Sequence, residues 1–305
     1  MSDLGLAASI LRAACGDRLR TDFPLAPLTT FRIGGPAALY LEPESDHDLA
    51  AAGRAVVEGG VPVVVLGKGS NVLVADAGFA GLVLRLGRGY RWCARDGDRL
   101  TAGGAMPLPA LAGIALRHRL SGLEFGVAIP ATLGGAVWMN AGAHGHEVAE
   151  AVESVEVFRL RTGALEAVLA ADAGFHYRRS AMGEDTVVVG AHLRLVTGDP
   201  VAIRTSMDEA RDWRRATQPL AEPNCGSVFT NPHGLHAAQL IEAAGAKGRR
   251  VGGATVSTKH ANFIVAEPGA SAADVVALMA EVRAMVESDA GVLLEPEVRL
   301  VGSFS

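Results

Sequence analysis

Val61-Pro-Val-Val-Val-Leu-Gly-Lys-Gly-Ser-Asn-Val-Leu-Val74 narrows the choice of fold more than any other segment. Its first six residues form a short apolar run that is typical of a buried strand. A glycine-rich loop, Gly67 to Asn71, follows, and a second apolar run begins at Val72. A dinucleotide-binding fingerprint needs a third glycine where Val72 stands, and a helix after the loop. The segment therefore predicts an α/β unit, but not a standard Rossmann unit.

The loop itself is a candidate phosphate site. Glycines let backbone N–H groups approach an anion closely, and Ser70 and Asn71 add side-chain donors. A glycine-rich hairpin loop without a ligand is the alternative, and the loop alone does not decide between them.

The segments before this loop predict alternating helices and strands. Residues 3–15 have the spacing of an amphipathic helix, and residues 37–41 follow a loop as a strand. Ser45-Asp-His-Asp48 has the form of a capping box, which predicts a helix from there to about Glu58. Gly59-Gly60 ends that helix before the strand at Val61, so the order indicates an α/β arrangement.

The segments after the loop divide into two regions. Up to residue 200 we expect strands at 81–86 and 100–105, a helix at 107–119, a second glycine-rich cluster at 122–145, and β-hairpins within 152–170 and 185–196. From residue 201 we expect a separate α+β domain. Its predicted elements are a helix capped at Ser206-Met-Asp-Glu209, a helix at 236–244, strands within 251–266, a helix capped by Ser271 and a strand at 292–301.

The composition excludes several classes of protein. The chain has 305 residues, 49% of them hydrophobic, which is enough for two domains with full cores. A net charge of −5 and 5% aromatic residues argue against a nucleic-acid partner. The three cysteines, Cys15, Cys93 and Cys225, lack metal-ligand spacing and indicate a reducing compartment. No signal peptide or membrane-spanning run is visible, so we expect a cytoplasmic protein that binds no metal or membrane.

Three polar breaks beside apolar runs carry the candidate catalytic residues. They are Asn224-Cys-Gly-Ser-Val-Phe-Thr-Asn-Pro232, Tyr177-Arg-Arg-Ser180 and Leu294-Glu-Pro-Glu-Val-Arg299. Ser227, Arg178 and Glu297 within them offer a hydroxyl, a guanidinium and a carboxylate, which together can donate a proton and stabilise negative charge. An ordinary turn remains the alternative for an isolated Gly-Ser pair.

In this order the motifs resemble one family, the UDP-N-acetylenolpyruvoylglucosamine reductases, from about Leu28 to Val301. The segments that carry the resemblance are Thr29-Thr-Phe-Arg-Ile-Gly-Gly35, Gly67-Lys-Gly-Ser-Asn71, Ile129-Pro-Ala-Thr-Leu-Gly-Gly-Ala136, Asn140-Ala-Gly142, Tyr177-Arg-Arg-Ser180, Gly226-Ser-Val-Phe-Thr-Asn-Pro232 and Pro296-Glu-Val298. Each is weak alone, and their order makes the resemblance specific.

The resemblance implies an α+β protein with an FAD-binding part of the vanillyl-alcohol-oxidase (PCMH) type. Residues 1–200 would bind FAD in two subdomains, roughly 1–88 and 89–200, and residues 201–305 would bind the substrate. The cofactor-binding residues implied are Gly67, Lys68, Gly69, Ser70, Asn71, Val72, Ile129, Pro130, Gly134, Gly135, Asn140 and Gly142.

The family's reaction implies two stages. NADPH reduces FAD, and hydride then passes from flavin N5 to C3 of UDP-N-acetylenolpyruvoylglucosamine, which yields UDP-N-acetylmuramate for peptidoglycan synthesis. Arg178 would stabilise the charge that develops at C2 and its carboxylate. Ser227 would deliver a proton to C2, and Glu297 would act as the catalytic glutamate with a raised pKa.

The resemblance implies substrate contacts from Tyr177, Asn231, Lys247 and His260. Solvated surface remains the alternative for Lys247, and a hydrogen-bonded loop histidine for His260. The chain departs from the family pattern at Ala131, His144, Thr230 and Cys225. It also lacks a tyrosine-bearing insertion after Arg178, so it resembles the shorter subtype, for which we expect a monomer.

Two other readings stay open at this point. One is a flavin oxidase or dehydrogenase of the same fold that acts on an alcohol or hydroxy acid. The other is a flavin-binding protein without catalysis.

Overall fold

The computed structural model describes residues 2–304, which form two compact units that are not contiguous in sequence. Of the described residues, the first unit contains 2–23, 38–68 and 80–213, and the second contains 24–37, 69–79 and 214–304. The boundary predicted at residue 201 falls inside helix α5 (Pro200–Thr217), and two N-terminal segments belong to the second unit. In the part of the chain described, no helix combines the length and the apolarity that a membrane span requires.

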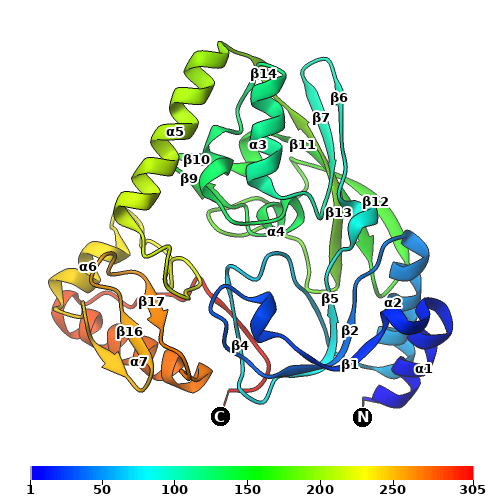
Figure 1. Cartoon of the computed structure of the whole chain (residues 1–305), viewed down its shortest axis with the longest axis horizontal. Coiled ribbons are helices and arrows are strands. Elements are labelled where there is room, and N and C mark those ends of the chain that lie inside the picture. The colour runs from blue at the N-terminus through cyan, green and yellow to red at the C-terminus, as the bar shows by residue number, and fades with distance from the viewer. Residues whose placement is uncertain (1, 305) are drawn as a thin grey trace. The chain divides into compact units, whose positions relative to one another are not determined.

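The first unit has a four-stranded sheet in the order β1-β2-β5-β3 that begins near the N-terminus. Its strands are β1 (Arg20–Pro24), β2 (Pro36–Leu41), β5 (Phe79–Leu84) and β3 (Val63–Val65). Helices α1 (Leu4–Cys15) and α2 (Asp46–Gly59) lie side by side (Figure 1). Ser45 caps α2 as predicted, because its hydroxyl accepts from the Asp48 N–H.

A second, five-stranded sheet follows in the same unit. Its order is β12 (Ala164–Leu169), β11 (Val152–Arg159), β13 (Thr186–Arg194), β7 (Arg99–Gly103) and β6 (Cys93–Asp96), and all its pairings are antiparallel. Helices α3 (Leu108–Arg117) and α4 (Leu133–Trp138) share one hydrophobic core with β7, β11 and β13. Two short ribbons complete the unit, β8 (Leu120–Ser121) with β14 (Val196–Thr197) and β9 (Gly142–Ala143) with β10 (His146–Glu147).

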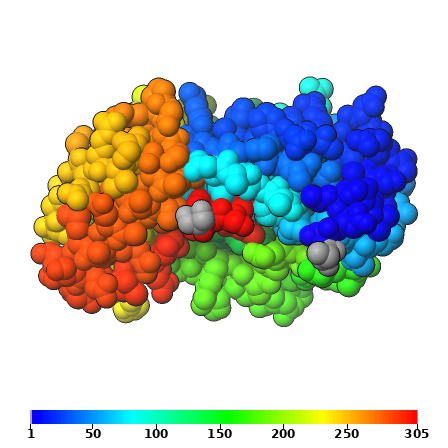
Figure 2. All heavy atoms as spheres, turned by 90° about the horizontal axis from the view of Figure 1, so that it is seen from below, coloured from blue at the N-terminus to red at the C-terminus, as the bar shows by residue number. Residues whose placement is uncertain are grey.

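The second unit has its own core. A three-stranded sheet, β15 (Arg250–Val251), β16 (Ala254–Val256) and β17 (Ile264–Ala266), packs with α6 (Ala237–Ala243) and α7 (Ala272–Ala290). Strand β4 (Val72–Val74) pairs in parallel with β18 (Arg299–Val301). In Figure 2 the red atoms of the chain's last residues lie next to cyan atoms. This pairing joins the predicted phosphate loop to the segment of Glu297.

Short 3-10 helices lie in the connections between these elements. They are η1 (Gly16–Arg18), η2 (Ala26–Leu28), η3 (Arg88–Tyr90), η4 (Glu124–Ala128) and η5 (Val148–Glu150). The capping box predicted at Ser271 is present and begins α7.

The cap predicted at Ser206 is wrong. Helix α5 begins six residues earlier, at Pro200, and Ser206 lies inside it. The Asp199 carboxylate accepts from the Val201 N–H at 3.1 Å, and proline suits the first helical turn. The strand predicted at 292–301 is reduced to β18, because residues around Pro296 pair with Phe229 only as an isolated bridge.

Candidate active site

The second unit brings Ser227 and Glu297 together through the main chain. The Val228 carbonyl accepts from the Glu297 N–H at 2.8 Å and from the Val298 N–H at 3.4 Å. Two residues on, Thr230 donates its N–H to the Glu295 carbonyl at 2.9 Å. The serine and the glutamate, 70 residues apart in sequence, are therefore carried by adjoining segments that hydrogen-bond to each other.

Asn262, which is not among the residues predicted from the sequence, holds the serine segment from its other side. Its side-chain oxygen accepts from the Phe229 N–H at 3.0 Å, and its side-chain nitrogen donates to the Phe229 carbonyl at 2.8 Å. Its own carbonyl accepts from the Val228 N–H at 2.9 Å. Asn262 is buried, so these bonds form away from water and are costly to lose. Its position in the polar break Lys259-His-Ala-Asn262 before a buried strand is the available sequence signal.

The Ser227 side chain is half-buried on this scaffold. Gly226 before it has φ +79°, a left-handed conformation that favours glycine, and donates its N–H to the Asn224 side chain at 2.9 Å. Within residues 2–304, no group is hydrogen-bonded to the Ser227 hydroxyl. This hydroxyl can therefore serve as a donor to a ligand.

The glycine-rich loop meets the same scaffold. Asn71 donates its side-chain N–H to the Glu297 carbonyl at 3.1 Å, and its own carbonyl accepts from the Arg299 N–H at 3.1 Å. Gly69 has φ +64°, and a Cβ there would lie 2.2 Å from the Leu28 carbonyl oxygen. Thr30 in turn donates its N–H to the Gly69 carbonyl at 3.0 Å. Three of the motifs named above thus meet in one place.

The loop fits an anionic cofactor group. In the described chain, the N–H groups of Lys68, Gly69 and Ser70 donate to no protein acceptor. Successive N–H groups of this kind form an anion-binding concavity. On the first unit's side, a Cβ at Gly67 would lie 2.8 Å from the Thr132 hydroxyl and 3.9 Å from the Gly135 Cα, so the two glycine clusters approach closely there. The diphosphate of a dinucleotide such as FAD suits such donors.

The remaining predicted cofactor residues have different surroundings. Gly134 donates its N–H to the Gly104 carbonyl, and a Cβ there would lie 2.9 Å from the Val188 carbonyl oxygen, so this glycine serves helix packing. Ile129 is half-buried against the core, and Pro130 is exposed. Val72 is the first residue of β4.

Arg178 lies in the first unit on a strained turn. Its φ of +57° is in the left-handed region, which non-glycine residues occupy at a cost, and mutual hydrogen bonds between His176 and Arg179 close the turn. The guanidinium Nη2 donates to the Gly142 carbonyl at 2.9 Å, and the guanidinium carbon lies 4.8 Å from the Tyr177 ring centroid. The side chain is 20% exposed. The cation is thus held in place by its own unit.

Glu147 and Asn140 complete this cluster. Glu147 Oε1 lies 3.7 Å from Arg178 Nη1, and Glu147 Oε2 accepts from the Asn140 amide at 2.8 Å. Asn140 also donates to the His176 carbonyl at 3.0 Å and accepts from the Ala149 N–H at 3.0 Å. Both of its amide hydrogens are therefore used within the protein. Glu147 is not among the residues predicted from the sequence, and its place as the first acidic residue after Glu124 is the available signal.

The predicted substrate residues divide between the units. Tyr177, in the first, is exposed and stacks on Arg178. In the second, Lys247 Nζ donates to Glu242 at 2.7 Å, and Asn231 accepts from the Ala237 N–H at 3.0 Å. Burial, together with the charge of Lys247, lowers the pKa of His260, so the imidazole is neutral at pH 7.

The departures from the family pattern are accommodated locally. Burial and the charge of Glu297 raise the pKa of the Cys225 thiol, so this cysteine stays protonated and unreactive at neutral pH. Thr230 hydrogen-bonds to Glu295. Ala131 packs on the core, and His144 sits edge-on to Trp213 with ring centroids 5.1 Å apart.

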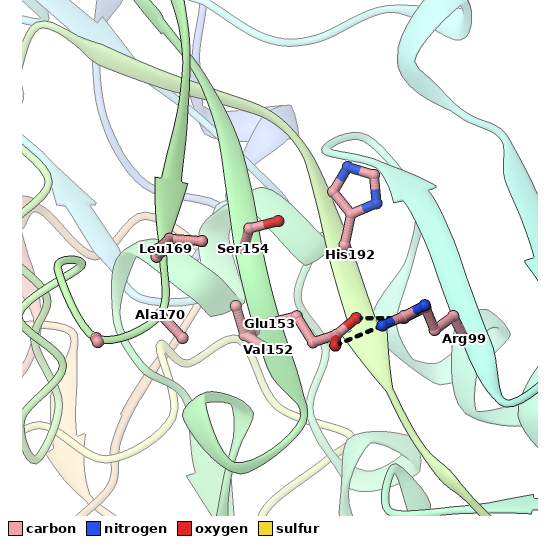
Figure 3. A pocket seen from close by; sticks show the side chains of 8 residues that line it. Arg99, Val152, Glu153, Ser154, Leu169, Ala170 and His192 are labelled. Atoms are coloured by element: carbon pink, nitrogen blue, oxygen red, sulfur yellow. Dashed lines mark hydrogen bonds and ion pairs between the residues drawn. The ribbon is translucent and has the colours of Figure 1, made fainter.

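A separate shallow hollow lies on the five-stranded sheet (Figure 3). Arg99 and Glu153 form an ion pair in it, and His192 lies between Thr101 and Glu156 on neighbouring strands. Its side chains pair with one another across strands, as on a solvated sheet face. None of the predicted site residues lines it.

Two family models match the chain. Residues 37–168 match an FAD-binding domain, and residues 218–301 match the C-terminal domain of UDP-N-acetylenolpyruvoylglucosamine reductase. A protein of that name from Anaeromyxobacter sp. (strain Fw109-5) is 47% identical over 99% of this chain and 94% of its own length. Its counterpart from Heliobacterium modesticaldum is 48% identical over 92% of this chain and 89% of its own.

Solved structures give the same result for the fold. The UDP-N-acetylenolpyruvylglucosamine reductase of Thermus caldophilus matches with a TM-score of 0.80 at 35% identity, over 93% of this chain and 98% of that one. A variant of berberine bridge enzyme matches with a TM-score of 0.52 at 12% identity, over 64% of this chain and 44% of that one. The second likeness concerns the fold alone and confirms the predicted α+β, PCMH-type architecture.

Proposed function

The chain belongs to the UDP-N-acetylenolpyruvoylglucosamine reductase family, and from this premise we propose how its residues reduce UDP-N-acetylenolpyruvoylglucosamine to UDP-N-acetylmuramate with FAD and NADPH. This reaction serves peptidoglycan precursor synthesis. The observation that carries the proposal is the main-chain pairing of the Ser227 and Glu297 segments. This pairing supports a proposal in which the Ser227 hydroxyl and the Glu297 carboxyl group act at one place.

The cofactor would be held by the loop from Gly67 to Asn71 with Val72. Backbone N–H groups of Lys68, Gly69 and Ser70 would bind its diphosphate, and Ile129, Pro130, Gly135 and Gly142 would lie along it. Asn140 could contribute only through its main chain or its amide oxygen, because its N–H groups bind Glu147 and His176. When bound, FAD takes a hydride from NADPH and supplies it to C3 of the enolpyruvyl group.

After hydride addition at C3, side chains of this protein would stabilise the negative charge and supply the proton. Addition at C3 places negative charge on C2 and its carboxylate. Arg178 would bind that carboxylate, because a guanidinium keeps its charge and forms paired hydrogen bonds. Ser227 would give its hydroxyl proton to C2. Glu297, in protonated form, would donate a hydrogen bond to the substrate carboxylate on which the negative charge develops. Tyr177, Asn231, Lys247 and His260 would hold the UDP-sugar.

We also propose a cytoplasmic monomer. The two substrates, a nucleotide sugar and NADPH, are charged metabolites of the cytoplasm. Light scattering coupled to gel filtration tests the monomer, and a mass of about 32 kDa is expected from the chain mass of 31.5 kDa. A mass twice as large would contradict it.

Anaerobic half-reactions test the proposed activity. Purified protein should be yellow, should lose its flavin absorbance with NADPH, and should regain it on addition of UDP-N-acetylenolpyruvoylglucosamine, with UDP-N-acetylmuramate as product. Bleaching without recovery would favour an oxidase or dehydrogenase with another substrate. Absence of bleaching would favour a flavin-binding protein without catalysis.

A further inference from the structure

We propose that Glu147 is a positioning residue for Arg178: it fixes the guanidinium for the enolpyruvyl carboxylate without touching the substrate. This inference rests on the proposed function of Arg178. Its basis is a set of contacts in the first unit that joins Glu147, Asn140 and the turn at residues 176–179.

The backbone of Arg178 needs support from its surroundings. A left-handed, non-glycine residue persists only where neighbouring contacts over-determine its conformation. The turn is held by the two bonds between His176 and Arg179 and by the Asn140 amide, which binds the His176 carbonyl at 3.0 Å. Asn140 therefore fixes the main chain from which the Arg178 side chain extends.

The same amide fixes Glu147. Asn140 Nδ2 donates to Glu147 Oε2 at 2.8 Å, and Asn140 is 1% exposed, so the donor does not exchange readily with water. The Glu147 main chain is held in the β9–β10 ribbon, where it pairs with Gly142. One carboxylate oxygen is thus bound to a buried amide, and the other faces the guanidinium.

The ion pair with Arg178 is longer than a hydrogen bond. Nη1 and Oε1 are 3.7 Å apart, whereas Nη2 is hydrogen-bonded to the Gly142 carbonyl at 2.9 Å. A carboxylate at this distance orients the cation by charge and does not form the paired hydrogen bonds that a substrate carboxylate would form. The two side chains are 20% and 32% exposed, so screening is incomplete.

Gly142 allows this close approach. A Cβ there would lie 2.9 Å from Glu147 Cγ and 3.1 Å from Arg178 Nη1. The glycine of the Asn140-Ala-Gly142 motif is therefore required by the Glu147–Arg178 pair as well as by the ribbon.

Glu147→Gln separates charge from hydrogen bonding, because the amide oxygen can still accept from Asn140. The variant should be reduced by NADPH at the wild-type rate, whereas reoxidation by UDP-N-acetylenolpyruvoylglucosamine should slow about tenfold or more, as expected for a displaced binding group. Glu166→Gln is the matched control: Glu166 pairs with Arg159 at 3.0 Å on the surface of the same unit, and its variant should behave as wild type.

A double-mutant cycle tests whether Glu147 acts through Arg178. In an Arg178→Ala background, Glu147→Gln should produce no further loss in the reoxidation rate. Equal losses in both backgrounds, or an unchanged rate in the single variant, would overturn the proposal. If wild-type protein itself is not reoxidised by this substrate, the proposed function fails instead. Equal melting temperatures of Glu147→Gln and wild type would confirm that the loss is not one of folding.

Discussion

The two clusters of candidate catalytic residues are held by different means. Ser227 and Glu297 stand on segments that main-chain hydrogen bonds from Glu297 and Val298 to the Val228 carbonyl join, and the buried Asn262 side chain reinforces them at Phe229. Arg178 is placed through its own side chain, because its guanidinium donates to the Gly142 carbonyl and lies near Glu147 and the Tyr177 ring, while Asn140 binds the strained turn at His176. Because main-chain bonds hold the serine segment, replacing the Ser227 side chain should leave the position of that segment unchanged. The position of the Arg178 guanidinium, in contrast, should change when a neighbouring residue is replaced.

The largest effect is expected from Ser227→Ala, which tests the main-chain-held cluster. Loss of a general acid should slow flavin reoxidation by the enolpyruvyl substrate about 10²- to 10⁴-fold. Reduction by NADPH and the melting temperature should stay unchanged, because the segment does not depend on the serine side chain for support. Stopped-flow absorbance of the two half-reactions measures this. Equal loss in both halves would remove Ser227 from the role of proton donor.

Asn262→Ala removes the side-chain hydrogen bonds that hold the segment of Ser227. It leaves the Phe229 N–H and carbonyl without partners in a buried place, which should lower the free energy of unfolding by about 2–4 kcal/mol. Urea denaturation followed by circular dichroism gives the value. A midpoint equal to that of wild type would mean that the serine segment does not need this amide.

Gly142→Ala tests the side-chain-held cluster. The new Cβ would meet the His146 carbonyl oxygen at 2.4 Å as well as Glu147 and Arg178, so the ribbon must shift. Stability should fall by about 1–3 kcal/mol, with a slower reoxidation step.

Gly113→Ala provides the control for this substitution. Gly113 lies inside α3, where the nearest atom to a new Cβ is 4.0 Å away, and the change should stabilise the protein by about 0.5–1 kcal/mol. Similar melting temperatures for the two alanine variants would show that Gly142 is not constrained.

The sequence predicts the elements whose signals are local. The serine caps at Ser45 and Ser271 lie in the residues that begin α2 and α7, and both are confirmed. Helix α4 escaped prediction because two of its six residues are glycines, and strand β1 because its exposed residues have no apolar alternation. The false cap at Ser206 arose because Asp199-Pro200 begins the helix first.

The residues of the candidate site also divide into those that have a local sequence signal and those that have none. Arg178, Ser227 and Glu297 stand in recognisable motifs, and their roles remain predictions. Asn262 and Glu147 support them through contacts far apart in sequence, for example the 33 residues between Asn262 and Phe229. No periodicity or local motif encodes such a partner. The same holds for the pairing of β4 with β18, which places residues 69–79 in the unit of the C-terminus.

A small effect is expected from the Arg18–Asp48 ion pair, which supports the fold and not the candidate site. Asp48, buried in the first turn of α2, accepts from Arg18 Nη1 at 2.5 Å and from Arg18 Nη2 at 2.7 Å, and it also accepts from the Glu44 N–H at 2.8 Å. The Arg18 bonds, more than any other contact, lower the pKa of this carboxyl from 3.8 to about 2. Unlike the Glu147–Arg178 pair, it is fully hydrogen-bonded.

Because the folded-state pKa is lowered, the charged Asp48 stabilises the native state above pH 3.8, and this contribution is lost as the pH falls through about 2. Asp48→Asn should therefore cost about 1–2 kcal/mol at pH 7 and much less at pH 2, with both half-reactions unaffected at pH 7. Urea denaturation at the two pH values measures it, since urea adds no charge to screen the pair. A cost that did not change with pH would assign the loss to packing. A slower reoxidation step at pH 7 would instead mean that the fold and the Arg178 cluster are coupled.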